Sequence, residues 1–262
     1  MPTLSPALTA YLYTLTAVLG LVMGSFLNCF AYRYAKGESV LKGRSCCALC
    51  GHTLSAPDLI PVFSWLLLRG KCRYCGGKFS PRYLLAEVLC ALAYVSVLWR
   101  FGLTLDTLKY LVLASLLFAA SFADLHGGLI PDRLILIGLA FALVFACISP
   151  EGPVWLSLLK TLGNGLSVSL PLLVIVLVFD RVMKTDSMGG GDIKLLFLIG
   201  LYFHWALNLL ILILACVVGL AWAMLLRRGR KDAFAFAPAV SAAAWLVMLW
   251  GQAALNWYLS LF

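Results

Sequence analysis

The chain has 262 residues, of which 63% are hydrophobic and 12% are charged. Soluble domains are about 45–50% apolar and about 25% charged, so this composition excludes a soluble enzyme, a disordered chain, a secreted disulfide-rich miniprotein and a nucleic-acid-binding protein. The net charge of +9 is expected to report membrane topology, because Lys and Arg accumulate in the cytosolic loops of membrane proteins. We therefore predict an all-α, polytopic membrane helix bundle surrounded by lipid.

The first apolar run covers residues 9–32 and contains no charged residue before its end. No Lys or Arg precedes it, whereas a secretory signal peptide begins with a basic region. We expect a retained transmembrane helix here and assign residues 1–33 to it.

The only long polar loop covers residues 34–82 and contains two C-x-x-C motifs. Cys47 and Cys50 form the first motif, and Cys72 and Cys75 form the second after an interval of 21 residues. This spacing is typical of a tetrahedral zinc site with four thiolate ligands. A glycine directly after each motif permits the tight turn that such a site requires. We predict a structural zinc ion, because four thiolates leave no coordination position for a substrate.

Two further residues near the first motif could also bind a metal. Cys46 stands one position before Cys47 and competes with it for the metal. His52 is predicted to be an ordinary loop histidine. Disulfides are disfavoured, because thiols in the cytosol are kept reduced.

The remaining residues, 83–262, are predicted to form a transmembrane bundle. Its longest apolar stretch, residues 195–226, exceeds one crossing of a core about 30 Å thick at about 1.5 Å per residue. We therefore divide this stretch near His204 into a short helix and a full one. With the first helix this makes about eight transmembrane helices, the others being expected over residues 83–99, 107–123, 134–148, 161–179 and 238–262.

The basic residues support this count. If the N-terminus lies outside, only three of the 20 Lys and Arg residues fall outside, namely Arg100, Lys109 and Lys160. This is a strong positive-inside bias, and it places the cysteine loop in the cytosol. Without the division near His204, the basic cluster at residues 227–231 would fall outside.

Two carboxylates stand where charge is rare in a membrane protein. Asp124 ends the third predicted span, and Asp192 begins the sixth, after three glycines. Both ends face the cytosol, so the two side chains are expected at the same depth. Acidic residues within transmembrane segments usually have a function.

Paired carboxylates share a proton, because two close negative charges are unfavourable. The ionised partner can then activate a water molecule for attack on a peptide carbonyl that the protonated partner polarises. The glycines Gly189 and Gly191 would let the backbone approach an extended substrate. We expect Lys194 to be near enough in sequence to tune Asp192.

Other roles remain open for the acidic residues. Asp132 follows Ile-Pro and is favoured as a helix N-cap over a role in the site. Asp192 could likewise cap its helix, whereas Asp124 at a helix C-terminus opposes the helix dipole. Glu87 either extends to the membrane surface or lines the site. Spacing alone leaves an aspartyl protease and a proton relay equally open.

Four motifs in order resemble the type IV prepilin peptidases, the bifunctional leader peptidases and methyltransferases of pilus and type II secretion systems. The motifs are Gly24-Ser-Phe-Leu-Asn28 with Arg33, the segment from Ile60-Pro61 to Cys75, Asp124 with Ile130-Pro131-Asp132, and Gly189-Gly-Gly-Asp192-Ile-Lys194. The match covers most of the chain.

The resemblance implies cleavage of the basic leader from prepilins or pseudopilins at the cytosolic face of the bacterial inner membrane. It assigns the catalytic pair to Asp124 and Asp192. It also implies N-methylation of the new N-terminal residue by S-adenosylmethionine, with the loop at 34–82 as part of the methyl-transfer apparatus.

Three rival functions follow from the same residues. A presenilin-like or signal-peptide-peptidase-like enzyme would cut a spanning peptide within the membrane. A proton-coupled transporter would use the aspartates as a relay, although no inverted repeat is visible. In a zinc-braced scaffold both aspartates would be dispensable.

Overall fold

A computed structural model of the chain describes residues 5–39, 44–47, 49–150, 152–184, 188–226 and 235–261. The regular secondary structure in these residues consists of helices, apart from two isolated β-bridges in the cysteine loop. The chain divides into two compact units, Met1–Thr107 and Leu108–Phe262. The predicted three-part division at residues 33 and 82 stays a prediction.

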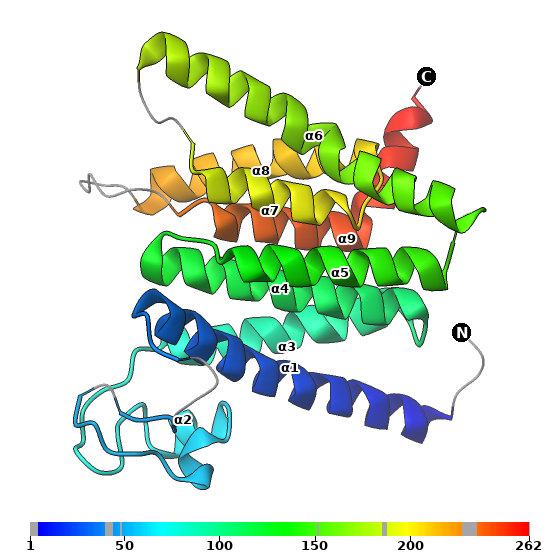
Figure 1. The fold of residues 1–262 in the computed structure, drawn as a ribbon. Helices are drawn as coiled ribbons and strands as arrows, with labels where there is room; N and C mark the ends of the chain where they lie inside the picture. Colours follow the sequence, from blue (N-terminus) through cyan, green and yellow to red (C-terminus); the bar gives the residue numbers. More distant parts are fainter. Residues whose placement is uncertain are drawn as a thin grey trace. The chain divides into compact units, whose positions relative to one another are not determined.

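The first unit is built on two long helices, α1 (Pro6–Ala35) and α3 (Arg82–Phe101), that pack against each other (Figure 1). Glycines make this contact close. A Cβ at Gly20 would stand 2.6 Å from Ala91 Cα, and a Cβ at Gly24 would stand 2.9 Å from Glu87 Cα. Small residues of this kind let membrane helices approach closely. The first of the four sequence motifs therefore begins at a helix-packing position.

The cysteine loop joins these two helices. It contains a short 3₁₀ helix, η1 (Ala56–Leu59), and one short helix, α2 (Phe63–Leu67). The two β-bridges pair Cys46 with Thr53 and Lys71 with Lys78, so each brackets one C-x-x-C motif. The loop is therefore organised around its cysteines.

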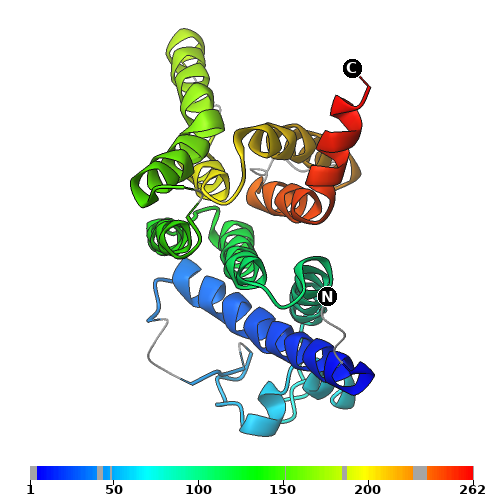
Figure 2. The same ribbon diagram turned by 90° about the vertical axis from the view of Figure 1, so that its right-hand side faces the viewer.

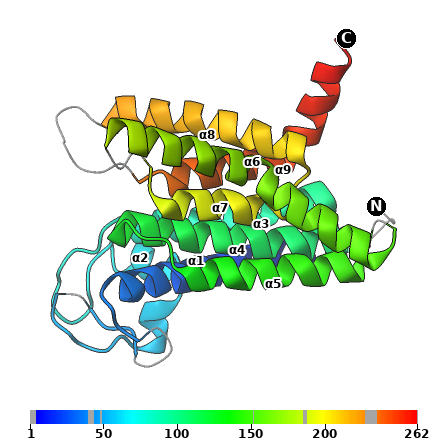
Figure 3. The same ribbon diagram turned by 45° about the horizontal axis from the view of Figure 1, so that its top comes forward.

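The second unit contains most of α4 and all of the last five helices. Their bounds are α4 Leu105–Gly127, α5 Asp132–Ile148, α6 Val154–Met183, α7 Gly190–Gly200, α8 Trp205–Leu226 and α9 Ala237–Leu259. Helices α8 and α9 lie side by side (Figure 2). The short helix α7 contacts α5, α6, α8 and α9 (Figure 3), and this makes it the centre of the unit.

Close backbone contacts and one buried amide hold α7 in place. A Cβ at Gly200 would lie 2.8 Å from Gly165 Cα on α6, so these two helices touch along their backbones. The buried Asn208 on α8 donates hydrogen bonds to the carbonyls of Asn164, Gly200 and Phe203. The predicted break near His204 is confirmed, because α7 ends at Gly200 and α8 begins at Trp205.

Among the residues that the structure describes, six helices are long and apolar enough to cross a membrane, namely α1, α3, α4, α6, α8 and α9. The chain is therefore a multi-pass membrane protein. All eight expected spans coincide with helices, but α5 has 17 residues and α7 only 11. Eight full crossings therefore stay a prediction.

The start of one helix differs from the prediction, and some of the basic residues cannot be compared with it. Helix α6 begins at Val154, before the predicted residue 161, because the helix continues through Lys160. Of the basic residues assigned to the cytosol, Lys42 and the cluster at 227–231 lie outside the described residues.

Candidate active site and metal centre

Asp124 lies in the last turn of α4 and meets the beginning of another helix. Its Oδ2 accepts a hydrogen bond of 3.0 Å from the backbone N–H of Ala237, the first residue of α9. The first N–H groups of a helix lack partners within the helix and carry partial positive charge. The N-terminus of α9 therefore stabilises a carboxylate that the C-terminus of α4 disfavours.

Sequence reasoning missed this partner. The proline that follows Ala237 is a known signal of a helix start. Asp124 and Ala237 are 113 residues apart in the chain. Their hydrogen bond is a tertiary contact, which local sequence patterns do not predict.

Asp192 is the third residue of α7 and lies outside the six candidate spans. The N-cap of α7 is Gly189, so the alternative role of Asp192 as the cap is wrong. Burial, and then the negative charge of Asp124, raise the pKa of Asp192 to about 6. The two predicted catalytic carboxylates are thus close enough to interact electrostatically, and both are partly buried.

The two aspartate motifs also touch beside the carboxylates. Ile130 packs against Gly191, where a Cβ would lie 3.4 Å from the Ile130 Cβ. Lys194 Nζ lies 2.6 Å from Asp132 Oδ1, and this exposed ion pair joins the first turns of α5 and α7. These contacts fix the two segments in one arrangement.

Two expectations are corrected here. Asp132 is the first residue of α5, and its N-cap is Pro131, so Asp132 is not the predicted cap. Its exposed side chain instead pairs with Lys194. Lys194 therefore does not set the pKa of Asp192 directly. That pKa is raised by burial and by the charge of Asp124.

The glycines before Asp192 are not required by packing. An added Cβ would meet nothing closer than 3.6 Å at Gly189 and nothing within 4 Å at Gly190. All three N-terminal positions of this segment could therefore hold alanine without a clash, since the contact at Gly191 is ordinary van der Waals distance. Packing within this unit therefore does not explain why these three positions hold glycine.

The four predicted cysteines converge in the first unit. The sulfurs of Cys47, Cys50, Cys72 and Cys75 all lie within 4.8 Å of one another, and Cys47 Sγ is 4.0 Å from Cys75 Sγ. Thiolates placed tetrahedrally about 2.3 Å from zinc stand about 3.8 Å apart. The four sulfurs would therefore fit around one metal ion if they moved slightly closer together.

The two motifs have the same backbone geometry. The N–H of each first cysteine donates to the carbonyl five residues later, in Cys47 to His52 and in Cys72 to Gly77. Cys46 is not part of the sulfur cluster. The ring of His52 instead lies tilted against the ring of Tyr74, with centroids 3.7 Å apart, as expected for a loop histidine.

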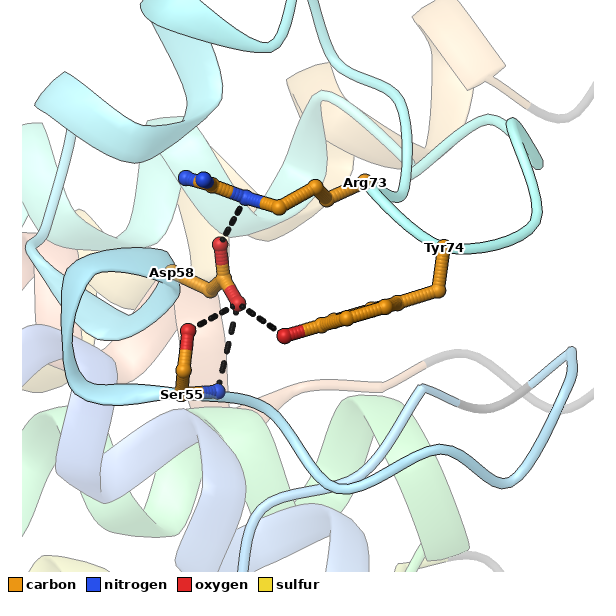
Figure 4. A network of polar contacts seen from close by, with 4 residues as sticks. All are labelled: Ser55, Asp58, Arg73 and Tyr74. Atoms are coloured by element: carbon orange, nitrogen blue, oxygen red, sulfur yellow. Dashed lines mark hydrogen bonds and ion pairs between the residues drawn. The ribbon is translucent and has the colours of Figure 1, made fainter.

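A carboxylate that sequence reasoning did not select organises the same loop. Asp58 accepts hydrogen bonds from the hydroxyl and amide of Ser55 at 2.6 and 3.2 Å, from Arg73 Nε at 2.8 Å and from Tyr74 at 3.3 Å (Figure 4). The Ser55 hydroxyl and amide, with Arg73, lower the pKa of Asp58 against the effect of burial. Asp58 thus ties η1 to the second cysteine motif.

Glu87 belongs to the first unit, where it lines a cavity. Its Oε2 accepts the backbone N–H of Val62 at 2.7 Å. The cavity measures about 500 Å³ and is bounded by α1, α3 and the cysteine loop. A role for Glu87 beside the aspartates stays a prediction.

The fold and site define a class, a multi-pass membrane protein with two interacting aspartates and a four-cysteine loop. Residues 18–101 match the model of the bacterial peptidase A24 N-terminal domain, and residues 111–224 match that of the type IV leader peptidase family. The chain belongs to the type IV leader peptidase family.

Three similar proteins match over nearly their whole length. A prepilin leader peptidase/N-methyltransferase of Pseudomonas putida is 35% identical, over 93% of this chain and 92% of the relative. The proteins of the same name from Aeromonas hydrophila and Neisseria gonorrhoeae are 30% and 29% identical, over 95% and 97% of this chain and 94% and 96% of the relatives. No solved structure matches the chain significantly.

Proposed function

We propose that this protein is a prepilin leader peptidase and N-methyltransferase. It removes the basic leader of type IV prepilins or type II secretion pseudopilins and then methylates the new N-terminal residue. The observation that carries the proposal is the pair Asp124 and Asp192, which come from separate helices and interact electrostatically. The family membership supports the same reaction.

Cleavage follows from the shared proton of the pair. The ionised aspartate takes a proton from water, and the oxygen of that water bonds to the scissile carbonyl carbon. The protonated aspartate gives its proton to the carbonyl oxygen, which forms a tetrahedral intermediate. When the C–N bond breaks, the aspartate that took the proton from water gives it to the amine nitrogen. The other aspartate takes a proton from one hydroxyl of the intermediate, which leaves a carboxylic acid and restores the singly protonated pair.

Neighbouring groups would support this step. The absence of side chains at Gly189 and Gly191 would let an extended peptide approach the backbone beside Asp192, and an added Cβ at Gly189 would meet only Asp192 itself, at 3.6 Å. The ion pair of Asp132 and Lys194 keeps the starts of α5 and α7 together. These residues are positioning residues in the proposal.

The cysteine cluster would hold zinc. Zinc bound by four thiolates contributes to folding and has no open position for catalysis. It would therefore shape the loop of residues 34–82, which we assign to methyl transfer with S-adenosylmethionine as the donor. Residues 1–33 would anchor the loop in the membrane, and residues 83–262 would form the peptidase bundle.

We place the protein in the bacterial inner membrane with its N-terminus outside. The distribution of Lys and Arg supports a cytosolic position for the cysteine loop and for both aspartates. A prepilin keeps its basic leader in the cytosol and its apolar helix in the bilayer. The scissile bond would then lie at the depth of the dyad.

A substrate panel with the purified full-length protein tests the proposal. We expect cleavage of a prepilin before its mature helix, with a product heavier by one CH₂ when S-adenosylmethionine is added, as read by mass spectrometry. An isolated spanning peptide should stay intact.

The panel also separates the rivals. Cleavage of the spanning peptide within its helix, with the prepilin uncut, would favour the presenilin-like enzyme. Proton movement in proteoliposomes without proteolysis would favour the transporter. Either result would contradict the proposed function.

A further inference from the structure

Two hydrogen bonds join α4 to α9 one helical turn away from Asp124. The hydroxyl of Ser121 on α4 donates to the hydroxyl of Ser241 on α9 at 2.8 Å, and the Ser241 hydroxyl donates in turn to the Leu117 carbonyl at 3.3 Å. Ser121 is buried and Ser241 is half-buried. The helix that carries Asp124 and the helix that donates to it are therefore tied at a second point.

The contacts between these two helices follow one face of each helix. On α4 the groups belong to residues 117, 121 and 124, and on α9 they belong to residues 237 and 241. Steps of three or four residues place side chains on the same face, one turn apart. The serine contact therefore lies only about 5 Å along each helix from the contact of the aspartate. A shift of α9 relative to α4 would change both contacts together.

The first turn of α9 has one N–H to offer to Asp124. The residue after Ala237 is a proline and has no N–H. The N–H groups of residues 239–240 already donate to the carbonyl of Phe236. The N–H of Ala237 remains, and it donates to Asp124. Because this donor belongs to the backbone, its position depends on where α9 as a whole lies.

The surroundings of the two serines favour such a tie. Both α4 and α9 are candidate membrane spans, and the hydrocarbon core of a membrane offers no competing hydrogen-bond partner. Serine hydroxyls commonly join helices there. Each hydroxyl has a single proton, which Ser121 gives to Ser241 and Ser241 gives to Leu117. Ser241 therefore makes two bonds to α4, whereas Ser121 makes one bond to α9.

We propose that Ser121 and Ser241 are positioning residues for cleavage, which hold the start of α9 where the Ala237 N–H can bond to Asp124. The inference rests on the aspartate pair of the proposed function, and the serines act through Asp124 and not on the substrate. The bond from Ala237 favours the ionised form of Asp124, which is the form that takes a proton from water. Without the serine contacts α9 can shift, and the aspartate pair then takes up its second proton at a higher pH.

Prepilin cleavage by purified full-length variants, measured across the acidic pH range, tests the positioning role. Ser241→Ala removes both bonds between the helices, so it should lower kcat about tenfold with KM close to the wild-type value. The acidic limb of the pH profile should move upward by about half a pH unit to one unit. Ser121→Ala removes one bond and should produce smaller changes of the same kind. The double variant should match Ser241→Ala, which already leaves Ser121 without its partner.

Two further variants separate positioning from packing. Ser157 is a buried serine on α6 whose hydroxyl donates to the Ala146 carbonyl on α5 at 3.2 Å. This contact lies near the last residue of α5, whereas the aspartate site lies beside its first turn. Ser157→Ala therefore removes a comparable bond between helices, and it should leave kcat and the acidic limb unchanged. Ser241→Thr keeps the hydroxyl and should keep the limb at its wild-type position.

The position of the acidic limb is independent of how much of a sample is folded, because it is read from relative rates. A sample returned from low pH should regain its rate, which separates titration from acid unfolding. An upward shift of the limb in Ser241→Ala that is absent from Ser157→Ala and Ser241→Thr supports the positioning role.

Other outcomes distinguish this inference from the proposed function. If the wild type cleaves prepilin and both alanine variants keep its kcat and acidic limb, the positioning role is wrong while the proposed function stands. A lower rate with an unmoved limb would leave Ser121 and Ser241 with a role in packing only, and it would also overturn the inference. A wild type that does not cut prepilin would contradict the proposed function, and the positioning role would fail with it.

Discussion

At the residue scale, the two aspartates differ in how their charge is stabilised. Asp124 receives an N–H from the start of α9, which favours its ionised form. Burial disfavours the ionised form of both aspartates, and their negative charges also disfavour each other, so the hydrogen bond to Asp124 makes the difference between them. This asymmetry favours Asp192 as the holder of the shared proton and Asp124 as the ionised partner.

The raised pKa of Asp192 predicts a decline of cleavage on the alkaline side. A group whose pKa is raised keeps its proton to higher pH, so the singly protonated pair persists well above the ordinary Asp pKa of about 3.9. As pH rises through the raised value, given as about 6 for Asp192, both carboxylates become ionised and the acid is lost. We expect kcat/KM for prepilin cleavage to fall with an apparent pKa near that value.

The pH profile should be reversible. A sample returned from alkaline pH to pH 6 should regain its activity, which separates titration from unfolding. A rate that stays flat through pH 9 would contradict the shared-proton mechanism.

The residue scale also shows what local sequence contains. The Asp and Cys candidates could be selected because charge in a membrane and C-x-x-C spacing are strong local signals. The partners of Asp124 and Lys194 could not, because both contacts join segments far apart in the chain. The residue preferences of N-caps favoured Asp132 as the cap of α5, but the N-cap in the structure is the preceding residue, Pro131.

At the element scale, the two cysteine motifs act as one unit. Their backbones repeat the same hydrogen bonds, and Asp58 links η1 to the second motif through Arg73 and Tyr74. The metal centre and the cavity share this loop, so the zinc ion would support the cavity without facing a substrate.

Replacement of Cys72 or Cys75 by serine should remove zinc. Serine is a poor ligand beside three thiolates, so metal analysis should give about one zinc per wild-type protein and far less in either variant. Cys46→Ser is the matched control, since Cys46 lies outside the cluster. Unchanged zinc in the Cys72 and Cys75 variants would exclude the four-thiolate site.

The contact of α6 with α7 depends on glycine. Gly200→Ala would place a Cβ 2.8 Å from Gly165 Cα, and backbone atoms cannot move aside as a side chain can. Overpacking of this kind costs about 1–3 kcal/mol, so we expect a lower melting temperature in detergent.

A control on α6 separates crowding from helix propensity. A Cβ at Gly163 would have nothing within 4 Å, and alanine favours helix over glycine by about 1 kcal/mol. Gly163→Ala should therefore leave the melting temperature unchanged or raised. Equal stability of Gly200→Ala and the wild type would show that the close contact is not required.

At the scale of the whole molecule, apolar runs and charge placement predicted the helices well. Hydropathy identifies lipid-facing segments directly, and the division before Trp205 followed from length and charge alone. Helix ends were less predictable, because α6 continues through Lys160 where the apolar pattern is interrupted. The convergence of α4, α7 and α9 on the aspartates required the tertiary structure.

The central claim is that Asp124 and Asp192 together cut the substrate. The most direct test is prepilin cleavage by the purified protein carrying Asp124→Asn or Asp192→Asn, with Asp106→Asn as the control. Asparagine keeps the size of the side chain, and its oxygen can still accept the Ala237 N–H. We predict that each site variant loses cleavage by at least about a hundredfold with an unchanged melting temperature, while the control cuts normally. Cleavage at the wild-type rate by either site variant would contradict the account.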